Sequence, residues 1–179
     1  EVLLLDASGK RLAAQVVAEQ VTDKSDWVAF KAADSPDAAS LDLSFLNEAP
    51  AGKRGFVKVV DGRYAFEDGT PVRFWGTDLV ANNAFLTHEQ SDALATRFAK
   101  LGINLVRFHH MDAPWSNPNI FDPSAKDTQT FSADSLDKLD YLLAALKKKG
   151  IYVYPDLLVH RKFREGDGVA DYNHLPEGA

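Results

Sequence analysis

The fold class of this chain is decided by the stretch Leu101-Gly102-Ile103-Asn104-Leu105-Val106-Arg107-Phe108-His109-His110. Its glycine is typical of the left-handed end of a helix, and an apolar run typical of a β-strand follows directly. Successive side chains of a strand point to opposite faces. Arg107 and His109 should therefore face one way, and Val106, Phe108 and His110 the other. If Val106 and Phe108 pack under a helix, Arg107 and His109 face the opposite side of the sheet.

Upstream of this stretch, the sequence predicts a helix. Thr87 followed by Gln90 forms a capping box, in which two side chains satisfy the first helical amides. Leu94, Phe98 and Leu101 then fall on one helical face, and Gly102 ends the helix. Before it, the residues 72–80 are expected to form a strand.

The same pattern repeats downstream. One apolar helical stripe is made of Leu136, Leu139, Leu143 and Leu146. Lysines follow at the negative helix end, and Gly150 closes the helix. Residues 151–159 are predicted to form the next strand, which Pro155 should end because proline donates no ladder hydrogen bond.

The resulting β-α-β-α-β order predicts parallel strands joined by right-handed crossovers. It suits either an open doubly wound sheet or a closed (β/α)8 barrel. The turn after the first strand, Trp75-Gly76-Thr77-Asp78, has no Gly-x-Gly-x-x-Gly, and the chain has no Gly-Lys-Ser/Thr phosphate loop. Dinucleotide-binding and nucleotide-hydrolysing classes are thereby disfavoured. A complete barrel needs at least about 200 residues, so 179 residues accommodate only its first three βα units.

The first part of the chain has a different pattern. Short apolar or alternating runs between residues 1 and 50 suit antiparallel strands, as in part of a β-sandwich. The punctuating segment 49–53 places a domain boundary near residue 50, with a β-rich segment at 1–50 and the βα units at 51–179. A hairpin should open the second part: runs at 56–60, 64–66 and 72–75 are separated by two turns containing Asp-Gly.

Polar residues gather where the predicted parallel strands end, which is where such folds place their sites. Asp78 follows the first strand, and Arg107, His109 and His110 end the second. Asp156 and His160 end the third, on the same face if that strand is regular. A buried Arg107 would need an acidic partner. The alternative is a structural ion pair, with histidines that merely cap a strand. A metal site at His109, His110 and Asp112 is disfavoured because adjacent strand residues point apart.

A long segment, 113–130, separates the second strand from the second helix. Segments of this length are usually functional or disordered. Trp115 within it could stack on a sugar ring, or could instead plug the segment onto the body of the protein.

The composition of the chain disfavours several classes of binding partner. A net charge of −6 and a pI near 5.3 disfavour nucleic acid and anionic membrane surfaces. No apolar run approaches the roughly 18 residues of a membrane span. The chain has no cysteine, which excludes disulfides and thiolate-bound zinc.

Three pieces of the chain resemble glycoside hydrolases with two catalytic glutamates on a (β/α)8 barrel, the cellulase-like family 5 and its relatives. The pieces are the hairpin with Asp61-Gly62-Arg63-Tyr64 and Asp68-Gly69-Thr70-Pro71-Val72-Arg73-Phe74-Trp75-Gly76, the strand Leu101 to Arg107, and Lys149-Gly150-Ile151-Tyr152-Val153. They cover about residues 54–160. The resemblance implies that Arg107 holds the nucleophilic glutamate and that His110 faces the substrate.

The chain also departs from the family pattern. The first strand usually ends in Gly-x-Asn, where this chain has Gly76-Thr77-Asp78. The third strand of many relatives carries Asp-x-His-His, whereas here Leu157-Leu158-Val159 follow Asp156 and the histidine comes only at His160. In the family, both catalytic glutamates follow later strands. The expectation is therefore an amino-terminal fragment of a retaining hydrolase of β-linked poly- or oligosaccharide, inactive alone.

The resemblance carries further expectations about ligands. Substrate binding would fall to six residues: Asp78, Arg107, His109, His110, Trp115 and His160. No metal or cofactor is expected. The partners would be a carbohydrate and the remaining part of the barrel, and the location secreted or periplasmic. The alternative is a non-catalytic carbohydrate-binding or scaffold α/β domain.

Overall fold

A computed structural model describes Ser25 and residues 42–171 of the chain. The chain divides into two compact units, Glu1–Ala33 and Asp34–Ala179, and every described helix and strand belongs to the second. The strands expected between residues 1 and 40 lie outside the described residues. The boundary near residue 50 and the β-rich first segment stay predictions.

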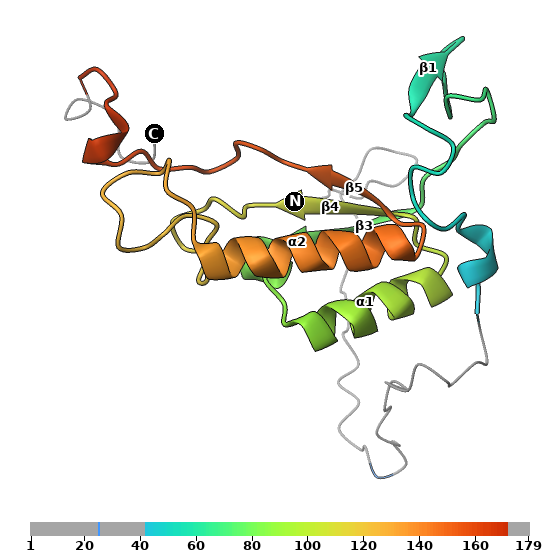
Figure 1. Cartoon of the computed structure of the whole chain (residues 1–179), viewed down its shortest axis with the longest axis horizontal. Helices are drawn as coiled ribbons and strands as arrows, with labels where there is room; N and C mark the ends of the chain where they lie inside the picture. Colours follow the sequence, from blue (N-terminus) through green and yellow to red (C-terminus); the bar gives the residue numbers. More distant parts are fainter. Residues whose placement is uncertain (1–24, 26–41, 172–179) are drawn as a thin grey trace, which may run out of the picture. The chain divides into compact units, whose positions relative to one another are not determined.

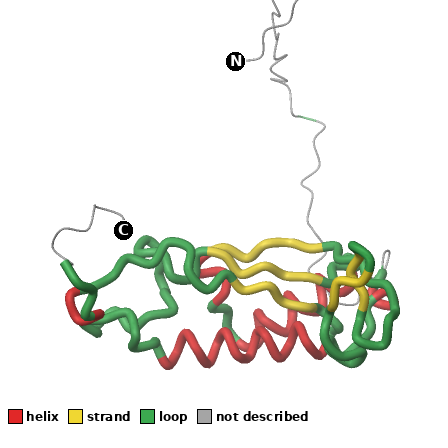
Figure 2. Tube along the Cα trace, turned by 90° about the horizontal axis from the view of Figure 1, so that it is seen from above, coloured by secondary structure: helices red, strands yellow, loops and turns green. Residues whose placement is uncertain are grey.

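A three-stranded parallel sheet forms the centre of the second unit. Its strands are β3 (Gly76–Val80), β4 (Leu105–His109) and β5 (Tyr152–Pro155), in the spatial order β3-β4-β5. Helix α1 (His88–Lys100) connects the first two strands, and α2 (Ala133–Lys148) connects the last two. Both helices lie on the same side of the sheet (Figures 1 and 2). The predicted β-α-β-α-β order and the parallel pairing are therefore confirmed, whereas closure into a barrel stays a proposal.

Helix α1 begins as the sequence predicted. The Thr87 side chain accepts a hydrogen bond from the Gln90 amide, and the Gln90 side chain accepts one from the Thr87 amide. This capping box satisfies two amides that have no partner inside the helix. Gly102 follows the helix with φ of +71°, a left-handed conformation that glycine adopts at little cost.

The buried face of α1 differs from the predicted one. Its fully covered positions are small residues, Ser91, Ala95 and Ala99, while Leu94 and Phe98 pack against the core from its flanks. Leu101 is 47% exposed, so its expected place on the buried face is wrong. Leu101 is the C-cap residue, which lies beyond the part of α1 that covers the sheet.

Helix α2 contributes a stripe of leucines to the apolar core. Leu142 and Leu146 are completely buried with Val106 and Phe108 of β4, and the predicted leucines at 136, 139 and 143 pack against this cluster. Burying one such side chain contributes about 1.5–3 kcal/mol relative to leaving it exposed. Gly150 then turns the chain into β5 with φ of +77°, as predicted.

The predicted hairpin is present in its first two strands. β1 (Lys58–Val60) pairs antiparallel with β2 (Arg63–Ala65), and the turn residues Asp61 and Gly62 both have positive φ. This is the geometry that Asp-Gly favours between strands. The third expected strand, 72–75, is wrong. Only the isolated bridge between Ala65 and Pro71 continues the pairing, with bonds from the Phe66 amide to the Thr70 carbonyl and from the Val72 amide to the Tyr64 carbonyl.

β3 begins at Gly76 and not at residue 72, and the cause is Asn104. Its side-chain oxygen accepts from the Trp75 amide at 2.7 Å, and its side-chain nitrogen donates to the Arg73 carbonyl at 2.9 Å. A side chain thus occupies backbone groups that a strand would have used for its ladder. The segment before Gly76 is consequently anchored without being a strand.

The remaining described elements are three short 3-10 helices, η1 (Ser44–Leu46), η2 (Ala81–Ala84) and η3 (Glu165–Asp167). Residues around η1 lie at the carboxyl ends of both α-helices, because the Leu43 amide donates to the Lys100 carbonyl and the Ala51 amide donates to the Lys147 carbonyl. These bonds satisfy helix-end carbonyls that have no partner inside their own helix.

Candidate functional site

The two faces of the sheet have opposite chemistry. Val106 and Phe108 of β4 are completely buried, whereas Arg107 and His109 lie on the other face, as the alternation predicted. The strand register aligns Arg107 with Asp78 of β3 on one side and Tyr154 of β5 on the other. In the described part of the chain, both α-helices lie on one side of the sheet (Figure 2), and a row of polar side chains crosses the other side.

Arg107 has an acidic partner, although its side chain is 42% exposed and not buried as the prediction assumed. Its Nη2 donates to Asp156 Oδ2 at 2.6 Å, and its Nη1 lies 3.9 Å from Asp78 Oδ2. The ring nitrogen Nδ1 of His109 also hydrogen bonds to Asp156 Oδ2. Asp156 directly follows β5, and its amide donates to the Phe108 carbonyl, so the last bond of the β4–β5 pair positions this carboxylate.

These contacts fix the charges of the site. Hydrogen bonds from Arg107, and then from His109, hold the pKa of Asp156 below its usual value, because they favour the carboxylate over the neutral acid. The same hydrogen bond raises the pKa of Arg107. The guanidinium Nε is buried and has no hydrogen-bond partner among the described residues. The site therefore presents a fixed cation with part of its donor capacity unused.

A second cluster lies beside this row and is made of His110, Trp115 and His160. His110 has φ of +59°, which turns its ring back toward His109, 3.7 Å between ring centroids. The His110 ring lies 5.4 Å from the Trp115 ring and 6.0 Å from that of His160. An aromatic wall of this kind offers flat apolar surface together with ring nitrogens that can hydrogen bond.

Trp115 does not plug the body of the protein, because it is 59% exposed. The segment that carries it is nevertheless ordered. Asn119 accepts from the Phe121 amide and donates to the Ala113 carbonyl, and Arg164 donates to three carbonyls farther along the segment. An exposed indole on a fixed loop can receive a ligand at a low cost in side-chain entropy.

Of the six residues that the sequence selected, Asp78, Arg107 and His109 lie together on the open face, and His110, Trp115 and His160 form the adjacent wall. Tyr154 and Asp156 also contact or face Arg107, although they were not among the predicted site residues. The expected place of Asp156 and His160 on one strand face is wrong, because β5 ends at Pro155. The register of β4 with β5 is the signal that would have found Tyr154, since it stands directly opposite Arg107.

A metal site in the described residues would need a group of side chains that could bind one ion. No group of three or more His, Asp or Glu side chains in this part of the chain is arranged to hold a metal ion. The carboxylate of Asp112, the third member of the disfavoured metal alternative, accepts hydrogen bonds from backbone amides instead.

No helix among the described residues is long and apolar enough to cross a membrane.

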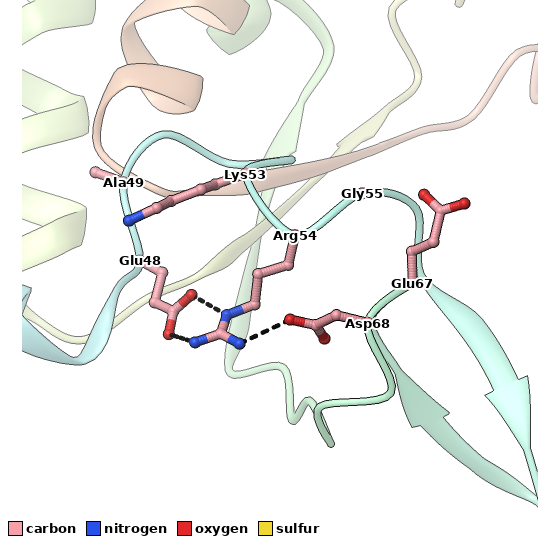
Figure 3. Close-up of a pocket in the computed structure, with 7 residues that line it drawn as sticks. All are labelled: Glu48, Ala49, Lys53, Arg54, Gly55, Glu67 and Asp68. Atoms are coloured by element: carbon pink, nitrogen blue, oxygen red, sulfur yellow. Dashed lines mark hydrogen bonds and ion pairs between the residues drawn. The ribbon is translucent and has the colours of Figure 1, made fainter.

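A separate pocket of about 640 Å³ lies between the segment 48–55 and the turn after β2 (Figure 3). Arg54 spans it, with bonds to both oxygens of Glu48 and a 2.9 Å bond to Asp68 (Figure 3). The hydrogen bond with Glu48 is the largest of the contacts that raise the pKa of Arg54. Because its ions pair with one another, this network anchors the hairpin and leaves no unpaired guanidinium for a ligand.

Comparisons with known proteins give one partial likeness. No family model matches the chain, and no curated protein matches it. A solved glycoside hydrolase family 5 protein from Bacteroides vulgatus is similar in structure, with a TM-score of 0.43 and 20% identity. The likeness covers 61% of this chain and 25% of that protein, so the chain spans about a quarter of its length.

Proposed function

We propose that this chain forms the first three strands and two connecting helices of a barrel glycoside hydrolase that cleaves β-linked poly- or oligosaccharide with retention of configuration. No α-helix after β5 is present among residues 42–171, so the third of the three expected βα units is represented by its strand. The observation that carries the proposal is the location of Arg107. It lies on the sheet face opposite α1 and α2, between Asp78 and Tyr154, with its guanidinium anchored by Asp156. A cation held in mid-strand by a carboxylate that directly follows β5 suits a site that orients a further carboxylate against a sugar.

The catalytic carboxylates are proposed to come from elsewhere in a longer protein. Retaining hydrolysis needs two carboxyl groups about 5–5.5 Å apart, one as acid/base and one as nucleophile. None of the described glutamates belongs to β3, β4 or β5: Glu48 and Glu67 line the pocket of Figure 3, Glu89 belongs to α1, and Glu165 to η3. Residues 42–171 would then supply the binding and electrostatic part of the site.

Each side chain has a role in this proposal. Arg107 would bind the nucleophile through donor groups that Asp156 leaves free, and the bond from His109 to Asp156 would hold that carboxylate in place. Trp115 and His110 would stack on the apolar C–H face of a sugar, while ring nitrogens of the wall would bind its hydroxyls.

A second candidate is a non-catalytic carbohydrate-binding or scaffold domain. It is favoured by the exposure of Trp115 beside His110, because a binding module needs a sugar-facing aromatic side chain and no carboxylate pair. Catalysis separates the two candidates. The hydrolase requires glutamates from additional βα units, whereas the module would bind saccharide fully as it stands.

The test combines binding and turnover. Calorimetric titration with cello-, xylo- and manno-oligosaccharides should show saturable binding that Trp115→Ala weakens, while this chain alone leaves an aryl β-glycoside uncleaved. Trp75→Ala is the matched control, because Trp75 is also exposed, at 70%, but precedes β3 at the other end of the sheet.

Three results would contradict the proposal: no saccharide bound at all, equal losses in the two tryptophan variants, or glycoside turnover by this chain that Arg107→Ala abolishes. If a longer reading frame containing this chain cleaves the aryl β-glycoside, its activity should fall with Arg107→Ala. Full activity in that variant would remove the hydrolase role assigned to Arg107.

A further inference from the structure

Asp112 is a buried carboxylate that sequence analysis considered only as a metal ligand. It is 7% exposed and lies in the turn that follows β4. Its Oδ2 accepts from the Val159 amide at 2.9 Å, and its Oδ1 accepts from the His160 amide at 3.2 Å. Both donors belong to the segment after β5, 47 and 48 positions farther along the chain.

Beyond the ends of β4 and β5, the Asp112 carboxylate holds the two segments together in place of backbone hydrogen bonds. The last backbone bond between the two strand ends in the described residues runs from the Asp156 amide to the Phe108 carbonyl, and Leu157 and Leu158 beyond it are 87% and 66% exposed. The segment then returns to the end of β4 at Val159 and His160, where Asp112 binds two successive amides. Hydrogen bonds to a charged acceptor are stronger than ordinary amide pairs.

The two hydrogen bonds from the Val159 and His160 amides to the Asp112 carboxylate, called the clamp below, determine where His160 lies. The turn of Asp112 is tied to His110, because the Ala113 amide donates to the His110 carbonyl at 3.2 Å. His110 and the His160 backbone are thus held by one turn, and their rings lie 6.0 Å apart. Trp115, three residues after Asp112, faces the same His110 ring. A displacement of the 156–160 segment would separate His160 from the other two rings.

We propose that Asp112 is a positioning residue that holds His160 against His110 and so fixes the shape of the aromatic wall formed by His110, Trp115 and His160. The inference rests on the proposed carbohydrate-binding function and deepens it. Asp112 itself touches no sugar, since both of its oxygens are occupied by backbone amides. Its contribution is the preorganisation of side chains that would otherwise lose entropy on binding.

The test measures the clamp and its consequence separately. The hydrogen-exchange rates of the Val159 and His160 amides, measured by NMR in the free protein, report whether the two hydrogen bonds to Asp112 are intact. Titration with cellotetraose, and with xylotetraose and mannotetraose in parallel, measures the saccharide affinity of the aromatic wall. The variants are Asp112→Ala and Asp112→Asn, with Asp134→Ala as the matched control, because Asp134 is an exposed carboxylate paired only with Lys138 in α2.

In Asp112→Ala we expect exchange of the two amides to accelerate at least about tenfold, and affinity for the bound saccharide to fall about tenfold, which corresponds to the loss of one charged hydrogen bond. Asp112→Asn keeps an oxygen acceptor and should lie between the wild type and the alanine variant. Asp134→Ala should change neither quantity. Circular dichroism identifies a variant that does not fold, and in that case Asp112→Asn decides the outcome.

Unchanged exchange in Asp112→Ala would overturn the clamp. Accelerated exchange with unchanged saccharide affinity would reduce Asp112 to a purely structural residue and overturn the positioning role. Absence of saccharide binding by the wild type would instead overturn the proposed function itself, while the exchange rates still report on the clamp. The two failures are therefore distinguishable.

Discussion

The two faces of the β3-β4-β5 sheet come from the same short strands and yet differ in almost every respect. One face is covered by α1 and α2 and buries Val106 and Phe108 completely (Figure 2). The other carries Asp78, Arg107 and Tyr154 in one row, open to solvent in the described part of the chain. Alternation along a strand separates residues that stabilise the fold from residues free for binding, at one-residue spacing.

The largest expected effect concerns the covered face. Leu142→Ala removes a completely buried side chain and should lower the free energy of unfolding by about 2–5 kcal/mol, because it loses burial and leaves a cavity. Leu157→Ala is the same substitution at a position that is 87% exposed, and should stay within about 0.5 kcal/mol of the wild type. Urea denaturation followed by circular dichroism measures both. Similar losses would remove the distinction between core and open positions.

An intermediate effect on stability is expected from breaking the ion pair between Asp156 and Arg107. Asp156→Asn should lower the melting temperature at neutral pH and weaken its dependence on acid. Because the folded pKa of Asp156 is depressed, the wild type gains stability above the ordinary value of 3.8 and loses it as pH falls through the lower folded value. Thermal melts from neutral pH to below 3.8 check this. Asp134→Asn, at an exposed carboxylate, is the control, and an equal change there would contradict the assigned role.

The smallest effect on folding stability is expected for a substitution on the open face of the sheet, which should instead change self-association. β3 and β5 each pair with a single neighbour within residues 42–171, and unpaired edges beside exposed apolar groups promote association. We expect concentration-dependent self-association in sedimentation experiments, reduced by Tyr154→Lys. Tyr64→Lys is the control, since Tyr64 is equally exposed at 59% but lies in the hairpin. A monomer at all concentrations would contradict the open edge.

Short-range features were predictable because their partners are close in sequence. The Thr87–Gln90 capping box joins residues three apart, and Gly102 and Gly150 each end a helix through their own backbone angles. Alternation placed Arg107 and His109 correctly because it needs only a regular strand. Where the strand was not regular, as after Pro155, the same reasoning failed.

Long-range contacts could not be predicted in this way. Asp156 is 49 residues from Arg107, and the amides that Asp112 binds are 47 and 48 residues away. The displaced start of β3 has the same origin, because Asn104 reaches back 29 and 31 residues to hold the segment before Gly76. Each contact depends on strand register, which one sequence specifies only weakly.

By itself, the sequence determined the order of strands and helices, their caps, and the separation of apolar from polar side chains along β4. Those properties follow from local backbone preferences and from burial, which act over a few residues. Only the tertiary structure decided which carboxylate neutralises Arg107, that Tyr154 stands beside it, and that Asp112 brings His160 to His110. Hydrogen bonds act over about 3 Å, so residues distant in sequence can form them only after the folded chain has brought them together.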